Sequence, residues 1–166
     1  MNCYVFSLVF ALTGNLQPKW AEKKFTKLFI SNINKAIHYM KKARDLDSEQ
    51  RLGEYYCFKA FVLIREKIGN PNEIKELLNK TEELIEKYAQ SYSKLVKDYN
   101  MAYAWYYTNI EHDFVKVEDY ISEAYGIAFN VSRSDIDKID EIISIIEIYS
   151  KWEKYETAIS WIWLSI

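Results

Sequence analysis

Hydrophobic residues recur along this chain of 166 residues at a nearly constant interval and at helical spacing. The clearest column is Ala36, Leu77, Val117 and Ala158, whose members are separated by 41, 40 and 41 positions. The positions three before, four after and seven after it repeat with it: Ile33, Ile74, Phe114 and Tyr155; Met40, Thr81, Ile121 and Ile162; Ala43, Leu84, Ala124 and Ser165. Such offsets lie on one stripe of an α-helix. The period therefore predicts a repeated helical unit.

Turn-forming residues stand just before this stripe in three of the four units. They are Ser31-Asn32, Asn70-Pro71-Asn72 and His112-Asp113. Their polar side chains can cap a following helix, and proline cannot continue a preceding one. The fourth turn, Lys151 to Lys154, has no such signal and follows from the register alone. Each unit is therefore predicted to be two antiparallel helices, the second of which carries the stripe.

Together these elements predict an all-α fold of about four antiparallel helical hairpins. An apolar helix is expected over residues 1–17, followed by a repeat domain over residues 18–166. The four units of that domain cover about residues 18–47, 48–90, 91–132 and 133–166. The chain has only 4 glycines and 2 prolines, so long helices joined by short turns are expected.

Composition excludes a disordered chain, because 49% of the residues are hydrophobic and 16% are aromatic. The net charge of −2 hides an asymmetry. Residues 1–51 carry nine basic and four acidic residues, and the remainder carries 13 basic and 20 acidic ones. We expect most of these charges on solvated helix faces. The alternative is a dipolar molecule that steers a charged partner or associates head to tail.

The start of the chain is apolar over residues 1–13, but this stretch is too short to span a bilayer. Its leading region contains no Lys or Arg and no clear cleavage site follows, so we expect a buried helix, with secretion through this segment as the alternative. Cys3 and Cys57 are too few for a disulfide framework. These features favour a cytoplasmic protein in a reducing compartment.

Two segments resemble the second helix of a tetratricopeptide repeat. In residues 36–47, Ala36 and Ala43 stand at the two small positions of that family, and residues 155–162 are similar. Trp20 stands where the family often has a first-helix Trp. The period of 40 to 41 exceeds the family's 34, and Leu77 and Val117 replace small residues. The resemblance implies a right-handed α-solenoid that binds a protein or peptide segment on the concave face of its first helices, without catalysis.

The groove-facing spacing of that family selects a set of candidate partner-binding residues. They are Lys59, Glu66, Tyr99, Tyr106, Asn109, Asp140, Glu147 and Ser150. An Asn amide both donates to and accepts from a peptide backbone, and the acidic residues of the last unit would favour a basic segment. The alternative is that the aromatic residues between 99 and 107, which surround the helix, are core residues, and that Asn109 is a helix C-cap.

Motifs of catalysis and cofactor binding are absent from the sequence. It contains no GxxxxGK[ST], GxGxxG or GxSxG motif, and neither His38 nor His112 has a partner at metal-binding helical spacing. We therefore expect no catalytic, metal or cofactor site, and a protein that is not an enzyme.

Two other functions remain open at this stage. The basic N-terminal third alternates with aromatic residues such as Trp20 and Phe29, which would suit a nucleic-acid binder, although the pI of about 5.8 is against it. The last helix carries Trp161 and Trp163 and has no polar outer face, which predicts self-association through that helix and a homo-oligomeric structural protein without a peptide groove.

Overall fold

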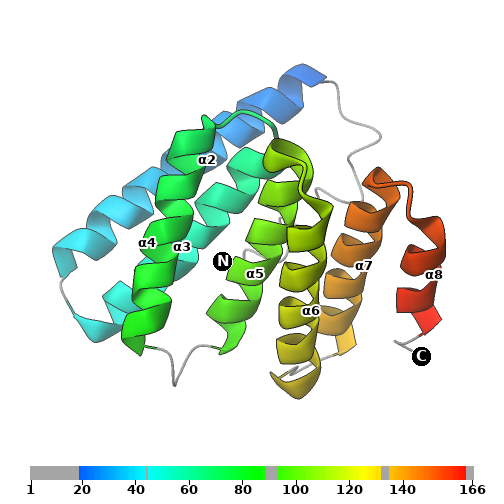
Figure 1. Ribbon diagram of the computed structural model, residues 1–166. Helices are drawn as coiled ribbons and strands as arrows, with labels where there is room; N and C mark the ends of the chain where they lie inside the picture. Colours follow the sequence, from blue (N-terminus) through cyan, green and yellow to red (C-terminus); the bar gives the residue numbers. More distant parts are fainter. Residues whose placement is uncertain (1–18, 44, 89–92, 132–134, 164–166) are drawn as a thin grey trace.

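The computed structural model describes residues 19–43, 45–88, 93–131 and 135–163, which form α-helices and one π-helix joined by short turns (Figure 1). In chain order the elements are α2 (Lys19–Ala43), α3 (Leu46–Arg65), α4 (Pro71–Tyr88), α5 (Ser93–Tyr106), the π-helix η1 (Tyr107–Glu111), α6 (Phe114–Val131), α7 (Asp135–Lys151) and α8 (Tyr155–Trp163). No strand occurs in these ranges, so the all-α prediction is confirmed. The helix expected over residues 1–17 lies outside the described residues.

Three antiparallel hairpins follow one another: α3 with α4, α5 with α6, and α7 with α8 (Figure 1). Helix α3 also packs against α5, and α6 packs against α7, so neighbouring hairpins lie side by side. Helix α2 packs against α3, which runs back alongside it in the opposite direction (Figure 1). The turns predicted at residues 70–72, 112–113 and 151–154 are confirmed.

Helix α2 is continuous where the sequence predicted a turn. It has 25 residues and runs through Ser31 and Asn32 without a break, so the prediction of a turn at this position was wrong. Both side chains are exposed, and α2 contains no glycine or proline. A Ser or Asn in a helix costs only about 0.5 kcal/mol. Burial of Ile33, one residue further on and only 5% exposed, outweighs that cost.

Side-chain caps start the helices that follow two of the confirmed turns. Asn70 Oδ1 accepts a hydrogen bond from the backbone N–H of Asn72 at 2.9 Å, and Pro71 is the first residue of α4, where an N–H has no helical partner. At the start of α6, Asp113 Oδ1 accepts from the backbone N–H of Lys116 at 3.3 Å. The polar residues that predicted these turns thus act as caps.

The first helix of each hairpin ends at a residue in the left-handed conformation. These residues are Lys67, His112 and Glu153, with φ of 53°, 55° and 56°. After α3 the backbone N–H of Ile68 donates to the carbonyl of Leu63 at 3.2 Å, the bond that closes a Schellman motif. Glycine usually occupies this position, because a Cβ costs roughly 1 kcal/mol there. The backbone N–H of Lys154 donates to the carbonyl of Tyr149 in the same way after α7, whereas after η1 the corresponding bond, from Asp113 to Tyr107, spans one residue more. All three hairpins therefore reverse direction through a left-handed residue at the same end.

The recurring hydrophobic stripe faces the core in α4 and α6. Val117, Ile121 and Ala124 are completely buried, and Ile74 and Leu77 are 1% and 7% exposed. Each large aliphatic side chain buried in this way contributes roughly 1.5–3 kcal/mol. In α4 and α6 the period therefore marks the positions at which the helix packs against the rest of the fold, whereas in α8 Ala158 is 3% exposed and Tyr155 is 58% exposed.

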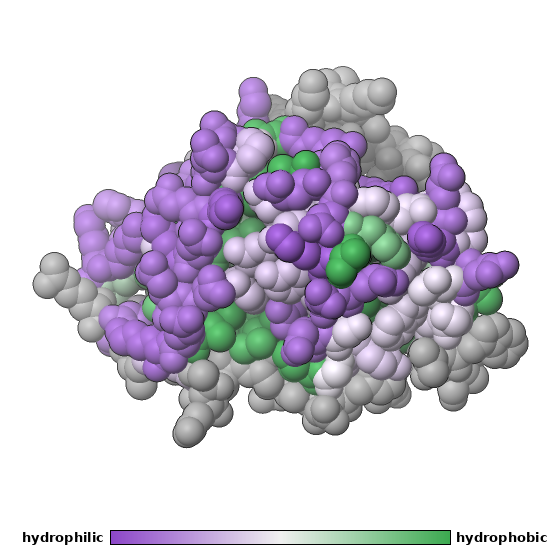
Figure 2. Space-filling model, in the orientation of Figure 1, coloured by the Kyte–Doolittle hydropathy of each residue, from purple (hydrophilic) through white to green (hydrophobic). Residues whose placement is uncertain are grey.

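The surface shown in Figure 2 is mostly hydrophilic over α2 and α4 and more mixed toward α6 to α8. The last hairpin exposes four large apolar residues, Ile139, Ile143, Tyr155 and Ile159. Of the described helices, none combines the length and the hydropathy that crossing a membrane requires.

Candidate functional site

The turns at the ends of the three first helices meet around a cavity of about 330 Å³. The residues that line it come from all three hairpins: Lys67, Thr108, Asn109, His112, Lys151 and Trp152. Two of them, Lys67 and His112, are left-handed turn residues, so the shared turn geometry helps to form the cavity. We call this the hairpin-end cavity.

The π-helix η1 supplies two side chains to the hairpin-end cavity. Thr108 is 5% exposed, and its hydroxyl accepts a hydrogen bond from Nε1 of Trp152 at 3.2 Å. This bond connects the second and third hairpins. Single π-helical turns are frequent at functional sites, because the extra residue redirects the side chains. In η1 the adjacent residues Thr108 and Asn109 both line the cavity.

Lys151 is the central cation of the cavity. Its Nζ donates to Asn109 Oδ1 at 2.9 Å and lies 4.4 Å from the centre of the Trp105 ring. The pKa of Lys151 is lowered, chiefly because its ammonium group is partly removed from water, although the side chain as a whole remains exposed. Repulsion by Lys67 lowers the pKa further and exceeds the opposing effect of Glu147. The field at Lys151 is therefore positive.

Asn109, which accepts a hydrogen bond from Lys151, also carries a buried hydrogen-bond donor. Its Oδ1 is held by Lys151, so its Nδ2 points elsewhere. That nitrogen is buried and has no acceptor among the described residues. An unpaired buried donor costs about 1–3 kcal/mol, so such groups are uncommon in folded proteins. An acceptor supplied by a ligand would remove this cost.

No carboxylate lines the cavity, and several carboxylates nearby are already engaged. Glu147 forms an ion pair with Arg65 at 3.5 Å, which joins α7 to α3. Glu111 accepts a hydrogen bond from the Tyr106 hydroxyl at 2.8 Å. Lys67 has no ion-pair partner among the described residues. The cavity is therefore suited to hold an anionic or hydrogen-bond-accepting group.

Of the candidate partner-binding residues, only Asn109 lines the cavity itself. Glu66 and Ser150 precede the lining residues Lys67 and Lys151 in the chain, so they belong to the same end of the hairpins.

The other candidates are structural or lie elsewhere. Lys59 forms an ion pair with Glu73 at 2.9 Å, which joins α3 to α4. Tyr99 and Tyr106 are only 8% and 3% exposed. The side chain of Asp140 lies outside the described residues.

The aromatic residues of α5 pack between α5 and α6 rather than around a groove. Tyr103 stacks on Tyr120 with ring centres 4.9 Å apart, and Tyr107 stacks on Tyr120 at 5.6 Å. Tyr99 meets Tyr103 edge to face at 4.9 Å. Burial raises the pKa of Tyr99 and Tyr103 above the ordinary value, so these hydroxyls stay protonated.

Of the two tryptophans that predict self-association, Trp161 and Trp163, the structure describes the side chain of Trp161. Trp161 is half-buried and contacts Tyr125 edge to face with ring centres 4.4 Å apart, so it packs onto α6. The side chain of Trp163 lies outside the described residues.

Sequence reasoning missed the cations and the tryptophan of the cavity, Lys67, Lys151 and Trp152. A weak signal was present, because the turn residues His112 and Glu153 are one period of 41 apart and must therefore lie at the same end of the fold. Nothing in the sequence showed that Lys67 and Lys151 act on each other across two hairpins.

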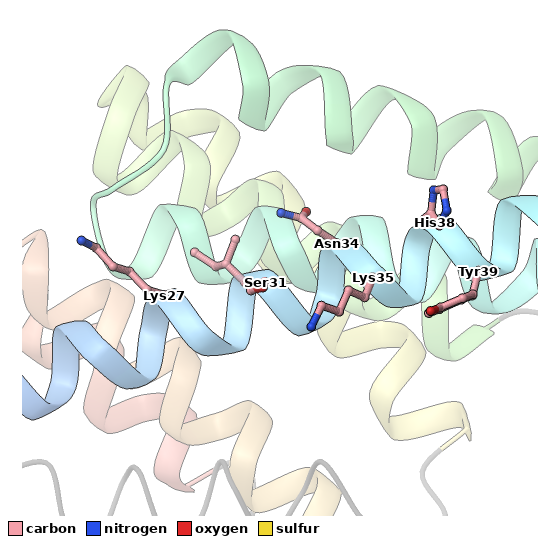
Figure 3. A pocket seen from close by; sticks show the side chains of 7 residues that line it. Lys27, Ser31, Asn34, Lys35, His38 and Tyr39 are labelled. Atoms are coloured by element: carbon pink, nitrogen blue, oxygen red, sulfur yellow. The ribbon is translucent and has the colours of Figure 1, made fainter.

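A second concave surface of about 460 Å³ lies along α2 (Figure 3). Asn34 and His38 project on one side of the helix, and Lys35 and Tyr39 project on the other. Its residues all belong to one helix, and no buried polar atom without a partner occurs in its described part. The nucleic-acid alternative depends on this basic surface and stays a prediction. The hairpin-end cavity is the more specific site.

The described residues contain no group of three or more His, Cys, Asp or Glu side chains arranged to hold a metal ion. Cys57 is buried in α3, and burial raises the pKa of its thiol well above the ordinary value, which disfavours the nucleophilic thiolate.

The chain matches no protein-family model, and searches of curated proteins and of solved structures found no match.

Proposed function

We propose that this protein is an interaction module that binds a peptide or protein segment at the hairpin-end cavity. The observation that carries the proposal is the convergence of three hairpin ends on one cavity lined by Asn109, whose Nδ2 is buried and has no acceptor among the described residues. A partner that offers a carbonyl or another acceptor would satisfy this donor. Lys67 and Lys151 would add charge, and Trp152 would add contact area.

The proposal includes a tetratricopeptide-like, right-handed α-solenoid. Its support is the stripe at 40 to 41 positions, the order of the three hairpins, and the packing of α3 against α5. In such an array the first helices of successive units form one surface. The burial of Tyr99 and Tyr106 moves the expected contact region from the middle of α5 to the ends of the first helices.

A displayed library of random peptides, selected against the full chain, tests this function. We expect selected peptides to lose about tenfold in affinity for Asn109→Ala, because a hydrogen bond to the partner is removed. Affinity for Lys42→Ala should be unchanged, since Lys42 is an exposed lysine just before α3, whereas the cavity lies beyond the end of that helix. Fluorescence anisotropy would give the affinities, and circular dichroism would show that both variants fold.

Two results would count against the proposal. The first is a selected peptide that binds Asn109→Ala and the unmodified protein equally well. The second is a set of peptide-induced amide shifts that map to α2 instead of to residues around Lys67, Asn109 and Lys151.

A second candidate function is self-association, favoured by the apolar residues that α7 and α8 expose. Ile139 and Ile143 are 55% and 48% exposed, and Tyr155 and Ile159 are 58% and 53% exposed. Within each pair the residues are four apart and so share one side of their helix. Contact of these two helix sides with other copies of the chain would bury the four side chains.

A further inference from the structure

We infer that the hairpin-end cavity is a carboxylate-binding subsite, in which Lys67, Lys151 and the Asn109 amide nitrogen together hold one carboxylate of the partner. This inference rests on the proposed function and names the group that the partner must offer. The carboxylate can belong to an Asp or Glu side chain or to a peptide C-terminus, which share the same chemistry.

The charges around Lys151 favour an anionic group in the cavity. Lys67 lowers the pKa of Lys151 by more than Glu147 raises it. The positive charges of the two lysines, which both line the cavity, therefore repel each other. Arg65, another cation near Lys151, is already paired with Glu147. A carboxylate placed between the two lysines would turn this repulsion into two attractions.

The unpaired donor of Asn109 also favours a group that accepts hydrogen bonds. Lysines near helix C-termini are common, because they interact favourably with the helix dipole, and that alone would explain Lys67 and Lys151. It does not explain the buried Nδ2 of Asn109, which has no acceptor among the described residues. A carboxylate has two oxygens, so one can accept from Asn109 while the other faces a lysine.

The chemistry favours a carboxylate over a phosphate. Sites for phosphate groups commonly use the paired N–H groups of Arg or several backbone N–H groups at a helix N-terminus. The cavity is lined by two lysines and one amide, and Arg65 is not among its lining residues. The two lysines and the amide can serve the two oxygens of a single carboxylate, and inorganic phosphate is the comparison that tests this choice.

Small carboxylates provide the direct test. N-acetylglutamate α-amide carries a side-chain carboxylate, N-acetylglycine imitates a C-terminus, and N-acetylglutamine amide is the neutral control. Each is titrated into the full chain at constant ionic strength, and NMR follows the side-chain amide of Asn109 and the terminal carbon of Lys151. We expect saturable shifts with one or both carboxylates, no saturable shift with the neutral amide, and a higher pKa for Lys151 in the bound state.

The matched variant is Asn109→Asp. It keeps an oxygen acceptor for Lys151 but replaces the donor with a negative charge, so carboxylate affinity should fall about tenfold or more. Lys42→Ala should bind as the unmodified protein does. The relative affinities of the two carboxylates show whether a side chain or a C-terminus is preferred.

The inference is overturned if neither carboxylate gives saturable shifts, if Asn109→Asp binds them as well as the unmodified protein, or if inorganic phosphate binds more tightly than both. Failure of the proposed function looks different. A library peptide that binds at the cavity without a carboxylate would leave the module intact and remove only the carboxylate subsite. Binding of the small carboxylates without binding of any library peptide would support the carboxylate subsite and count against the interaction module.

Discussion

The Nζ atom of Lys151 lies 2.9 Å from Oδ1 of Asn109, and this hydrogen bond joins α7 to the π-helix η1. The bond fixes the orientation of the Asn109 amide, because an ammonium group can only donate. The amide nitrogen is consequently directed into a buried position without an acceptor among the described residues. Both the charge of Lys151 and the unpaired donor can be altered by single substitutions.

Removing the charge of Lys67 should raise the pKa of Lys151. Repulsion by Lys67 is the second largest cause of the lowered value, after the loss of hydration. In Lys67→Ala the pKa should therefore move toward the ordinary value without reaching it. NMR of the Lys151 terminal carbon against pH measures the change. Lys42→Ala serves as the control, and equal Lys151 titration curves for the two variants would contradict the described arrangement.

Replacing Asn109 with Asp should stabilise the protein. The substitution removes the unpaired donor and gives Lys151 a charged acceptor, so the free energy of unfolding should rise by about 1 kcal/mol. Asn109→Ala removes the donor and the acceptor together and should change stability less. Urea unfolding of the three proteins measures the difference, and a lower stability for Asn109→Asp would show that Nδ2 has an acceptor.

The tyrosine stack should make the fold sensitive to alkali. Burial raises the pKa of Tyr120 to about 12, above the value of 10.0 in an unfolded chain. The folded state therefore favours the neutral phenol, and this stabilisation is complete below pH 10 and is lost as the pH rises toward 12. Unfolding by alkali should move to higher pH in Tyr120→Phe.

Circular dichroism and phenolate absorbance, recorded together against pH, would show this shift. Tyr39→Phe is the control, because Tyr39 is 64% exposed. Coincident alkaline transitions for the two Phe variants would argue against a special role for Tyr120.

Two helical glycines should respond differently to alanine. A Cβ at Gly126 in α6 would meet no atom within 4 Å, so Gly126→Ala should raise the free energy of unfolding by about 0.5–1 kcal/mol through helix propensity. A Cβ at Gly53 in α3 would come within 2.8 Å of Leu95 Cδ2, which would have to move. Gly53→Ala should therefore raise the free energy of unfolding by less than Gly126→Ala does, or lower it. Urea unfolding compares them, and equal gains would mean that α3 and α5 are packed more loosely than described.

Self-association through the last hairpin should depend on its exposed apolar residues. Sedimentation equilibrium at micromolar concentrations should show a mass above the 19.8 kDa of the monomer. The double variant Ile143→Lys/Ile159→Lys should lower that mass, because it places charges at two exposed apolar positions. Trp163→Asp tests the expectation from the sequence separately and should also lower it. A monomer mass for the unmodified protein at every concentration would exclude this candidate.

Local signals predicted most of the secondary structure. The residues Asn70, Pro71 and Asp113 marked two turns correctly, because they act through contacts within a few residues of the chain. Ser31 and Asn32 were misleading, because the same residue types are tolerated in a helix when their side chains face water. Whether such a pair ends a helix depends on what its neighbours bury.

The candidate site was less predictable. Asn109 was selected from the spacing within one helix, and it lines the cavity. Lys67 and Lys151 were not selected, because their importance comes from their effect on each other and from the Trp105 ring, all of which lie far apart in the sequence.

The sequence by itself determined the helices, most of their turns and the stripe that packs them, because periodicity and capping act over one or two helical turns. The tertiary structure alone decided that α2 is one helix, that Tyr99 and Tyr106 are buried, and that three hairpin ends meet around Asn109. Burial and electrostatic fields depend on distances between segments that are remote in the chain. A one-dimensional pattern therefore specifies which face of a helix is apolar, whereas packing decides which polar groups lose water and which charges meet.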